Sequence, residues 1–417
     1  MRTAELTRST QLDLATLRKA VAGSAVAIRC RSILQPAAGP GTKVFPPTHK
    51  EGKYAVERRR LPVMDDHGTI TSTREADCVL LDSVQSQANR IEDALQRAID
   101  DGLLEMPLIV VNFGSSVRDI QRVTSLQAPH RAADAILRDS LSSEKDSKGK
   151  LQPFRNSIVG RAITDSSLAN ATGLFRYCPH ALALGAWDST GPKGGMGAKF
   201  ARALVSEIVG IDSIIGTKTS SRLDPLQTRA AAKVVKKDDG SWTLASSDKE
   251  KGAISPAEIN HGNIPPDVAD GSATISHAEH TAVLSFPQLR RLRFPLDGSL
   301  DSNPGRQSEI DNAARTVIAA LALVGLTLAL EHGCDLRSRC LLFPEGPLEF
   351  ELLDTPGKPT PITLDAAAAI AIYDEAVKAA TKLGLPWEVK PTMLVPSPEL
   401  IDLVKKSQDL AAAVDGD

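Results

Sequence analysis

The sequence predicts an α+β protein, and three consecutive segments carry that prediction. Residues 25–34 (AVAIRCRSIL) alternate apolar and polar residues imperfectly, as a half-buried strand does. Residues 82–102 place apolar residues on one stripe at helical spacing, and Asp82 and Gln85 stand three apart as in a capping box. Residues 108–113 (LIVVNF) have the pattern of a short buried strand. Strand, long connection, helix and strand in this order are half of a split βαβ unit.

The connection between the first strand and the helix is long and basic. Residues 35–54 are rich in Gly and Pro and lead into residues 57–60 (ERRR). We interpret this stretch as one irregular segment, because long loops in compact domains tend to be functional or disordered. Two arginines of the first strand, Arg29 and Arg31, are expected on its solvent or ligand face.

Further helices and strands are expected between residues 129 and 215. We expect a helix over residues 129–139, a helix at 170–177 and a strand at 180–187. Between residues 200 and 215 the apolar residues match a helical period, but their Val and Ile content favours a strand, which we predict.

The last part of the chain combines a hairpin with a helical end. Residues 233–245 (KVVKKDDGSWTLA) predict a hairpin that turns at Asp239-Gly240, followed by loop to about residue 273. After this loop, we expect residues 281–295 to form another element of the core. The apolar run 317–330 has 14 residues, too few to span a bilayer, so we expect a helix buried in the core.

Composition and charge narrow the class of function. Of the 417 residues, 42% are apolar and 24% charged, as in a folded soluble protein, and only 4% are aromatic. The scarcity of aromatic residues argues against single-strand binding mainly by base stacking. The net charge of -2 hides a gradient, since residues 1–60 hold 12 Lys and Arg against 4 Asp and Glu, and residues 341–417 hold 6 against 13. This gradient suits a nucleic-acid-facing surface, head-to-tail assembly of identical subunits, or unrelated solvated faces.

Cysteine and histidine usage gives no sign of a metal or a disulfide framework. Five cysteines, at positions 30, 78, 178, 334 and 340, form no C-x-x-C pair, and we expect reduced, mostly buried thiols. The N-terminus is polar where a signal peptide is apolar, so we predict a cytoplasmic protein. His277 and His280 lack a second pair of ligands, and we expect ordinary surface histidines, no metal and no cofactor.

The most informative stretch is residues 187–225, which combines glycines with cations. Four clustered glycines and five basic residues mark it, namely Gly191, Gly194, Gly195, Gly197, Lys193, Lys199, Arg202, Lys218 and Arg222. Backbone without Cβ atoms can approach a phosphate closely and offer several N–H donors to it. The stretch fails the mononucleotide and dinucleotide templates. Taken alone, it is either a solvated turn or a cradle for a phosphodiester backbone.

Signatures of catalysis are mostly absent. The chain has no nucleophile elbow, no Walker lysine and no zincin helix motif. His130 beside Arg131 is the one arrangement that would suit RNA cleavage, as a general base next to a cation that binds phosphate.

Seven segments, in this order, resemble one family: LQPAAGPGTKVFPP, LLDSVQSQANR, SLQAPHRAADAILRDS, WDSTGPKGGMGAKFARALVSEIVG, SSRLDP, EINHGNIPP and LRRLRFPLDG. From about residue 25 to 300 the chain is similar to the large RAMP-superfamily, Cas-seven-type backbone subunit of type I-G (formerly I-U) CRISPR Cascade. The resemblance implies a ferredoxin-like (RRM-like) palm with insertions that act as fingers and a thumb, and a helical C-terminal part.

The resemblance also implies a function. Copies of such a subunit polymerise head-to-tail along the CRISPR guide RNA and leave its bases free to pair with target DNA in an R-loop. Other Cascade subunits and a recruited helicase-nuclease are the further partners, and no membrane is involved. Such a subunit binds phosphate and sugar and does not read the bases. The glycines and lysines of this sequence, which stand where base-reading side chains would otherwise be needed, agree with that role. The alternative is a RAMP endoribonuclease that acts on repeat or target RNA through His130 or Asp134.

These observations give a set of testable assignments. We predict a palm over residues 20–305, with residues 233–273 as the thumb, and a mainly helical extension over 306–417 that packs on it. The predicted RNA-binding residues are Arg31, Lys43, Arg58, Arg90, His130, Arg131, Lys193, Gly194, Gly195, Gly197, Lys199, Arg202 and Arg222.

Overall fold

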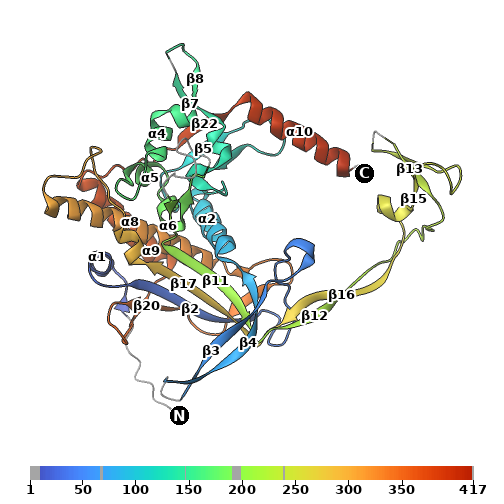
Figure 1. Ribbon diagram of the computed structural model, residues 1–417, viewed down its shortest axis with the longest axis horizontal. Coiled ribbons are helices and arrows are strands. Elements are labelled where there is room, and N and C mark those ends of the chain that lie inside the picture. Colours follow the sequence, from blue (N-terminus) through green and yellow to red (C-terminus); the bar gives the residue numbers. More distant parts are fainter. Residues whose placement is uncertain (1–9, 66–68, 146, 190–198, 238–239, 416–417) are drawn as a thin grey trace.

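The computed structural model describes residues 10–65, 69–145, 147–189, 199–237 and 240–415. Within them the chain forms a ten-stranded sheet, a five-stranded sheet, helices and a long two-stranded arm (Figure 1). The predicted α+β class is confirmed.

The ten-stranded sheet is the centre of the molecule. Its strands are β1 Thr10–Gln11, β2 Ala27–Pro36, β3 Val56–Met64, β4 Ile70–Asp82, β11 Leu204–Ile211, β17 His277–Ser285, β18 Cys334–Asp335, β19 Leu341–Pro344, β20 Glu349–Leu353 and β21 Thr360–Thr363. The order is β1-β21-β20-β2-β17-β11-β4-β3, and β19, which pairs with β18, joins at β2. Buried and half-buried residues alternate along β17, because one face of the sheet packs on the core and the other is open.

Helices cover the packed face. They are α1 (Leu14–Ala22), α2 (Val84–Asp100), α7 (Phe286–Arg290), α8 (Pro304–Glu331) and α9 (Ala366–Lys382), which share one hydrophobic core with the strands (Figure 1). By length and composition α8 could cross a membrane, but 83% of its most apolar window is buried inside the fold. It is therefore the central core helix, and the predicted buried helix at 317–330 is confirmed. Gly325 lets α2 come close, because an added Cβ would lie 2.6 Å from Ile91 Cγ2.

The five-stranded sheet lies above the helices in Figure 1. It consists of β5 (Ile109–Asn112), β6 (Arg122–Thr124), β7 (Ser140–Lys145), β8 (Leu151–Pro153) and β22 (Thr392–Pro396), in the order β6-β5-β22-β7-β8. Short helices surround it, namely α3 (Ala135–Arg138), α4 (Ile158–Thr164), α5 (Thr172–Tyr177) and α6 (His180–Leu184), and α10 (Pro398–Asp415) extends from it. Residues 306–417 thus supply strands to both sheets in addition to helices, and the domain boundary at 305 stays a prediction.

The arm is a two-stranded ribbon with a small sheet at its far end. The ribbon is β12 (Ile214–Arg222) paired with β16 (Ile264–Thr274), and the tip contains β13 (Val234–Lys236), β14 (Trp242–Leu244) and β15 (Ala253–Ile254) (Figure 1). The hairpin predicted at 233–245 is confirmed, although Asp239 of its turn lies outside the described residues. The predicted loop is wrong over residues 264–273, where β16 runs. Its Pro265 and Pro266 suggested loop, but a ribbon with free edges tolerates proline.

Two other predictions are wrong, and in the first of them long-range strand pairing overrides the local pattern. Residues 57–60 belong to β3, which pairs with β4 so that Arg58 faces Asp77 and Arg60 faces Glu75 across the strands. The strand predicted at 200–215 is confirmed over 204–211, but the strand predicted at 180–187 is mostly the helix α6.

The helix predicted at 129–139 is also wrong in part. A turn of 3-10 helix covers Arg131–Ala133 and the four-residue α3 follows, because Arg131 has a positive φ of 54° and Asp134 is extended. Asp82 does not cap α2 as predicted. Ser83 is the N-cap, and its hydroxyl accepts from the Ser86 backbone N–H at 3.2 Å.

His280 corrects another prediction, since it lies in the core and not at the surface. It is 1% exposed, on the packed face of β17. His277 is half-buried, and no group of three metal-ligating side chains occurs in the part of the chain that is described. All five cysteines are free thiols, four of them buried and Cys334 half-buried, as predicted.

The burial of His280 predicts a contribution to acid sensitivity. Burial lowers the pKa of His280 to about 4, against an unfolded value of about 6.5. The unfolded chain therefore binds more protons between these values, and this part of the stability is lost as the pH falls through that window. Between pH 7 and pH 5 the parent should lose about 2 kcal/mol more unfolding free energy than His280→Gln, measured by urea denaturation. Parallel pH profiles of the two proteins would contradict this.

Candidate nucleic-acid interface

The glycine-rich segment leaves the body on a short two-stranded stem. β9 (Ala186–Trp187) pairs with β10 (Lys199–Phe200), and Lys199 is the register partner of Trp187. The Lys199 Nζ lies 5.2 Å from the centre of the Trp187 ring, and Trp187 is 49% exposed. An exposed ring beside a cation can stack a base and hold its phosphate. Lys193, Gly194, Gly195 and Gly197 lie outside the described residues.

A buried ion pair supports the start of this stem. The Arg131 guanidinium donates to both Glu92 carboxylate oxygens, at 2.6 and 2.9 Å, and to the backbone oxygen of Gly185 at 3.2 Å. Arg131 is 6% exposed, so the prediction that it faces RNA finds no support in its placement. The guanidinium instead fixes the backbone one residue before β9.

Two guanidinium groups share the charge of Glu92. Burial raises the pKa of Glu92 to about 7, and the nearby Arg131 opposes that rise. Arg202 lies within the field of both, and its buried Nε has no hydrogen-bond partner among the described residues. Burial, and then Arg131, lower the pKa of Arg202, while Glu92 raises it. Positive charge is therefore in excess beneath the stem, where an anion would be stabilised.

His130 and Asp134 take part in a local turn. The exposed His130 donates its backbone N–H to Asp134 Oδ2 at 2.9 Å, and Asp134 Oδ1 accepts the Ile136 N–H at 2.8 Å. Both oxygens of the buried Asp134 thus bond the backbone as the N-cap of α3. A structural role accounts for this carboxylate.

The basic loop after β2 lies along the base of the arm. Val44 pairs with Ala273 and the Ser272 N–H donates to the Tyr54 hydroxyl at 2.7 Å. The exposed Lys43 donates from Nζ to the Thr217 backbone oxygen at 2.9 Å. Arg222 lies at the other end of β12 and donates to the Gly262 backbone oxygen at 3.1 and 2.8 Å. Lys43 and Arg222 therefore belong to the arm.

Two predicted residues lie on strands of the large sheet. Arg31 is exposed on the open face, next to Arg29, which binds Glu351 at 2.7 Å. Arg58 is exposed and has two carboxylates nearby, Asp77 at 3.2 Å and Glu75 at 3.7 Å. Exposed pairs of this kind are weak, so Arg58 can exchange them for a phosphate.

Arg90 is half-buried, and its hydrogen bonds go to groups within the fold. Its Nε donates to the fully buried Asp82 at 2.9 Å, and its Nη2 donates to the Leu336 backbone oxygen at 2.6 Å. Arg337 is a second cation on Asp82, at 3.3 Å. Arg90 therefore joins α2 to the segment after α8, and its predicted contact with RNA finds no support here.

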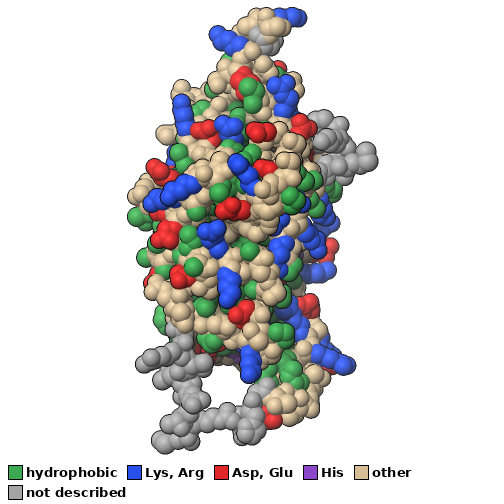
Figure 2. Space-filling model, turned by 90° about the vertical axis from the view of Figure 1, so that its left-hand side faces the viewer, with side chains coloured by type: hydrophobic (Ala, Val, Ile, Leu, Met, Phe, Trp, Pro, Cys, Tyr) green, Lys and Arg blue, Asp and Glu red, His purple; other side chains and the backbone are tan. Residues whose placement is uncertain are grey.

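The predicted residues thus fall into separate groups. Lys199, Arg131 and Arg202 lie around the stem, Lys43 and Arg222 lie on the arm, and Arg31, Arg58, Arg90 and His130 lie elsewhere. On the face shown in Figure 2, basic and acidic side chains of the described residues are interspersed, so this face carries no uniform basic surface.

Sequence reasoning missed two residues, Trp187 of the stem and Glu92 of α2 beneath it. Glu92 carried no signal, because a carboxylate on a helix predicts solvent exposure. Trp187 could have been found, since it is a rare aromatic residue directly before the glycine-rich segment.

One family comparison covers this region. Residues 28–214 match the family model described as CRISPR-associated protein GSU0053. The match supports a CRISPR-associated protein. It spans β2, α2, the stem and the glycine-rich segment, and it ends where the arm begins. A role in CRISPR defence is the function that it supports. No curated protein matches the chain.

Proposed function

We propose that the protein is a non-catalytic, guide-RNA-binding backbone subunit of a type I Cascade complex of the I-G kind. Several copies assemble along the spacer and present its bases to target DNA. The observation that carries this proposal is the stem, where Lys199 and the exposed Trp187 ring flank the glycine-rich segment inside the region that matches a CRISPR-associated family. An aromatic face, a cation and the backbone N–H groups of glycines serve any base sequence, as guide display requires.

The arm supports assembly of identical copies. It projects from the body on a two-stranded ribbon, and its tip exposes large apolar side chains, with Leu223 87% and Leu226 74% exposed (Figure 1). Exposed apolar side chains on a projecting element are typical of an interaction site. We assign the arm to contact with the next copy and its RNA, in a cytoplasmic complex with other Cascade subunits and a recruited helicase-nuclease.

Removal of the arm tip tests this assignment. Arg222 and Ile264 are register partners, so an Asn-Gly turn can replace residues 223–263 and close the ribbon. The shortened protein should keep the melting temperature of the body and bind RNA as a single copy, because the tip lies outside the core. Ordered assembly of several copies should be lost, as measured by native mass spectrometry on guide RNA.

The hairpin β7–β8 provides a matched control. Lys145 and Leu151 are register partners there, so an Asn-Gly turn can replace residues 146–150. This control should assemble like the parent. Full assembly without the arm tip would remove the arm from the contact between copies.

A further inference from the structure

The open face of the ten-stranded sheet carries an exposed apolar patch beside the base of the arm. Phe343 and Leu341 of β19 are 70% and 49% exposed, and Ile33 of β2 is 43% exposed. Phe343 is the register partner of Gln35, and Ile33 lies two residues from Gln35 on the same strand, so these side chains share one face. Gln35 Nε2 also donates to the Ser276 backbone oxygen at 2.8 Å, close to the end of β16, where the arm joins the sheet.

A groove of about 480 Å³ continues this patch across the sheet. It is lined by Ile33 and by three carboxylates, those of Glu279, Glu345 and Glu349. Glu345 and Glu349 are exposed, and their carboxylates form no hydrogen bond or ion pair with another described residue. Arg31 is the one Lys or Arg among the described residues that line the groove. An excess of carboxylates repels the phosphates of RNA and attracts cations, so the surface suits a basic and apolar segment of protein.

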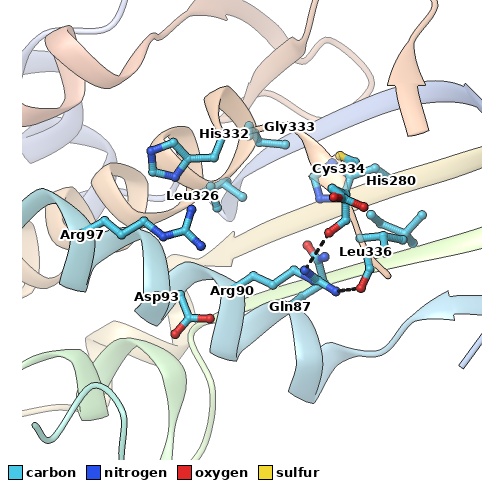
Figure 3. Close-up of a pocket in the computed structure, with 14 residues that line it drawn as sticks. Gln87, Arg90, Asp93, Arg97, His280, Leu326, His332, Gly333, Cys334 and Leu336 are labelled. Atoms are coloured by element: carbon cyan, nitrogen blue, oxygen red, sulfur yellow. Dashed lines mark hydrogen bonds between the residues drawn. The ribbon is translucent and has the colours of Figure 1, made fainter. Parts of the chain in front are cut away.

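The β18–β19 hairpin, which presents most of the patch, is held from the packed side of the sheet. Arg90 of α2 donates to the backbone oxygens of Asp335 at 3.3 Å and of Leu336 at 2.6 Å, at the end of β18 (Figure 3). The Leu336 N–H in turn donates to the Cys340 backbone oxygen at 3.0 Å, directly before β19. The patch is therefore in place before a partner arrives, which lowers the entropy cost of binding.

The tip of the arm presents a complementary element. Leu223 and Leu226 are 87% and 74% exposed, and the exposed Arg229 that follows forms no side-chain hydrogen bond or ion pair with another described residue. The Asp224 carboxylate accepts the backbone N–H groups of Leu226 at 3.0 Å and of Gly262 at 2.9 Å. These hydrogen bonds fix a loop that holds two leucines in solvent with a cation beside them.

We propose that the arm tip of one copy docks on the apolar patch of the next copy. Leu223 and Leu226 pack against Phe343 and Ile33, and Arg229 faces the glutamates of the groove. This contact rests on the proposed assembly along guide RNA and names the surface that receives the arm. Tip and patch are different surfaces of the chain, so the contact is heterologous and repeats from copy to copy. Copies on one RNA have a high effective concentration, so a small contact suffices.

Chemical cross-linking on guide RNA tests the contact. A variant with Leu226→Cys and Leu341→Cys keeps the other apolar side chains, and it is assembled on the RNA and treated with a short bismaleimide. Denaturing gel electrophoresis should show a ladder of covalent dimers and higher multimers, which is absent without RNA and in either single-cysteine variant. The matched control combines Leu226→Cys with Ile158→Cys, a 64% exposed residue at the start of α4, and should give monomers.

Further variants test the chemistry of the contact. Phe343→Asp should lose multi-copy assembly in native mass spectrometry and keep the affinity of one copy for a short RNA, measured by fluorescence anisotropy. Arg229→Glu should lose assembly, and so should Glu345→Arg combined with Glu349→Arg. The three charge changes in one chain should recover assembly, because each charge then meets its opposite again.

Three results would overturn the proposal, and they differ in what they say about the proposed function. If the parent forms multi-copy particles but the Leu226→Cys and Leu341→Cys variant gives no more cross-linking than the control, the arm docks elsewhere and the proposed function stands. If Phe343→Asp weakens binding of one copy to RNA, the patch is an RNA contact. If the parent forms no multi-copy particles on guide RNA, the proposed function fails together with this contact.

Discussion

Charge reversal at Lys193 and Lys199 together is expected to abolish assembly on guide RNA. Lys199 lies over Trp187 at the stem, and Lys193 lies in the glycine-rich segment that the stem carries. Each cation that binds a phosphate contributes about 1.5–3 kcal/mol, so loss of two should weaken binding at least a hundredfold. Fluorescence anisotropy with labelled guide RNA at several salt concentrations measures both the affinity and its salt dependence.

The control for this experiment reverses two other lysines. Lys378 and Lys382 are exposed on α9, four residues apart, and change the net charge by the same amount. Their reversal should leave most of the affinity in place. Unchanged assembly and an unchanged salt slope in the Lys193/Lys199 variant would remove the glycine-rich segment from the binding site.

Truncation of Arg131 to Ala should have the largest effect on stability. The change removes from Glu92, which is 3% exposed, the guanidinium that binds both of its carboxylate oxygens, and leaves only Arg202 nearby. Breaking one side of a buried ion pair costs about 3–5 kcal/mol. Urea denaturation of Arg131→Ala should show this loss, and Arg131→Met combined with Glu92→Leu should recover most of it.

The double variant also separates folding from RNA binding. Arg131 holds the Gly185 backbone oxygen, so a stable protein without it should still bind guide RNA more weakly than the parent. Arg122→Ala is the control, because its pair with Asp100 at 2.6 Å is half-exposed and should cost less than about 1 kcal/mol. Equal losses in Arg131→Ala and Arg122→Ala would contradict a structural role for the Arg131–Glu92 pair.

The core elements could be predicted from the sequence because their signals are local. Alternation marked the strand at 25–34, a single apolar stripe marked α2, and an apolar run marked α8. Pairing between distant segments leaves no such signal. The sequence of residues 57–60 did not indicate that they pair with strand β4. Likewise, residues 264–273 gave no indication that they pair with strand β12.

Prediction of the RNA interface was limited in the same way, because contacts between distant segments leave no local signal in the sequence. Glycines and cations identified the stretch at 187–225, but sequence cannot tell a free arginine from one that pairs inside the fold. Arg90 and Arg131 were expected to face RNA, and they bind the buried carboxylates Asp82 and Glu92. His280 was expected at the surface for a related reason, since a polar residue within a strand gives no sign of the face on which it lies.

Nuclease footprinting of RNA that co-purifies with the protein tests the central proposal most directly. Subunits of one kind that repeat along a guide should protect the RNA at regular intervals, while the glycine-rich grip ignores its sequence. The account predicts a ladder of evenly spaced protected segments that keeps its spacing when the guide sequence is changed. RNA that is absent, uniformly digested, or protected at one site only would contradict it.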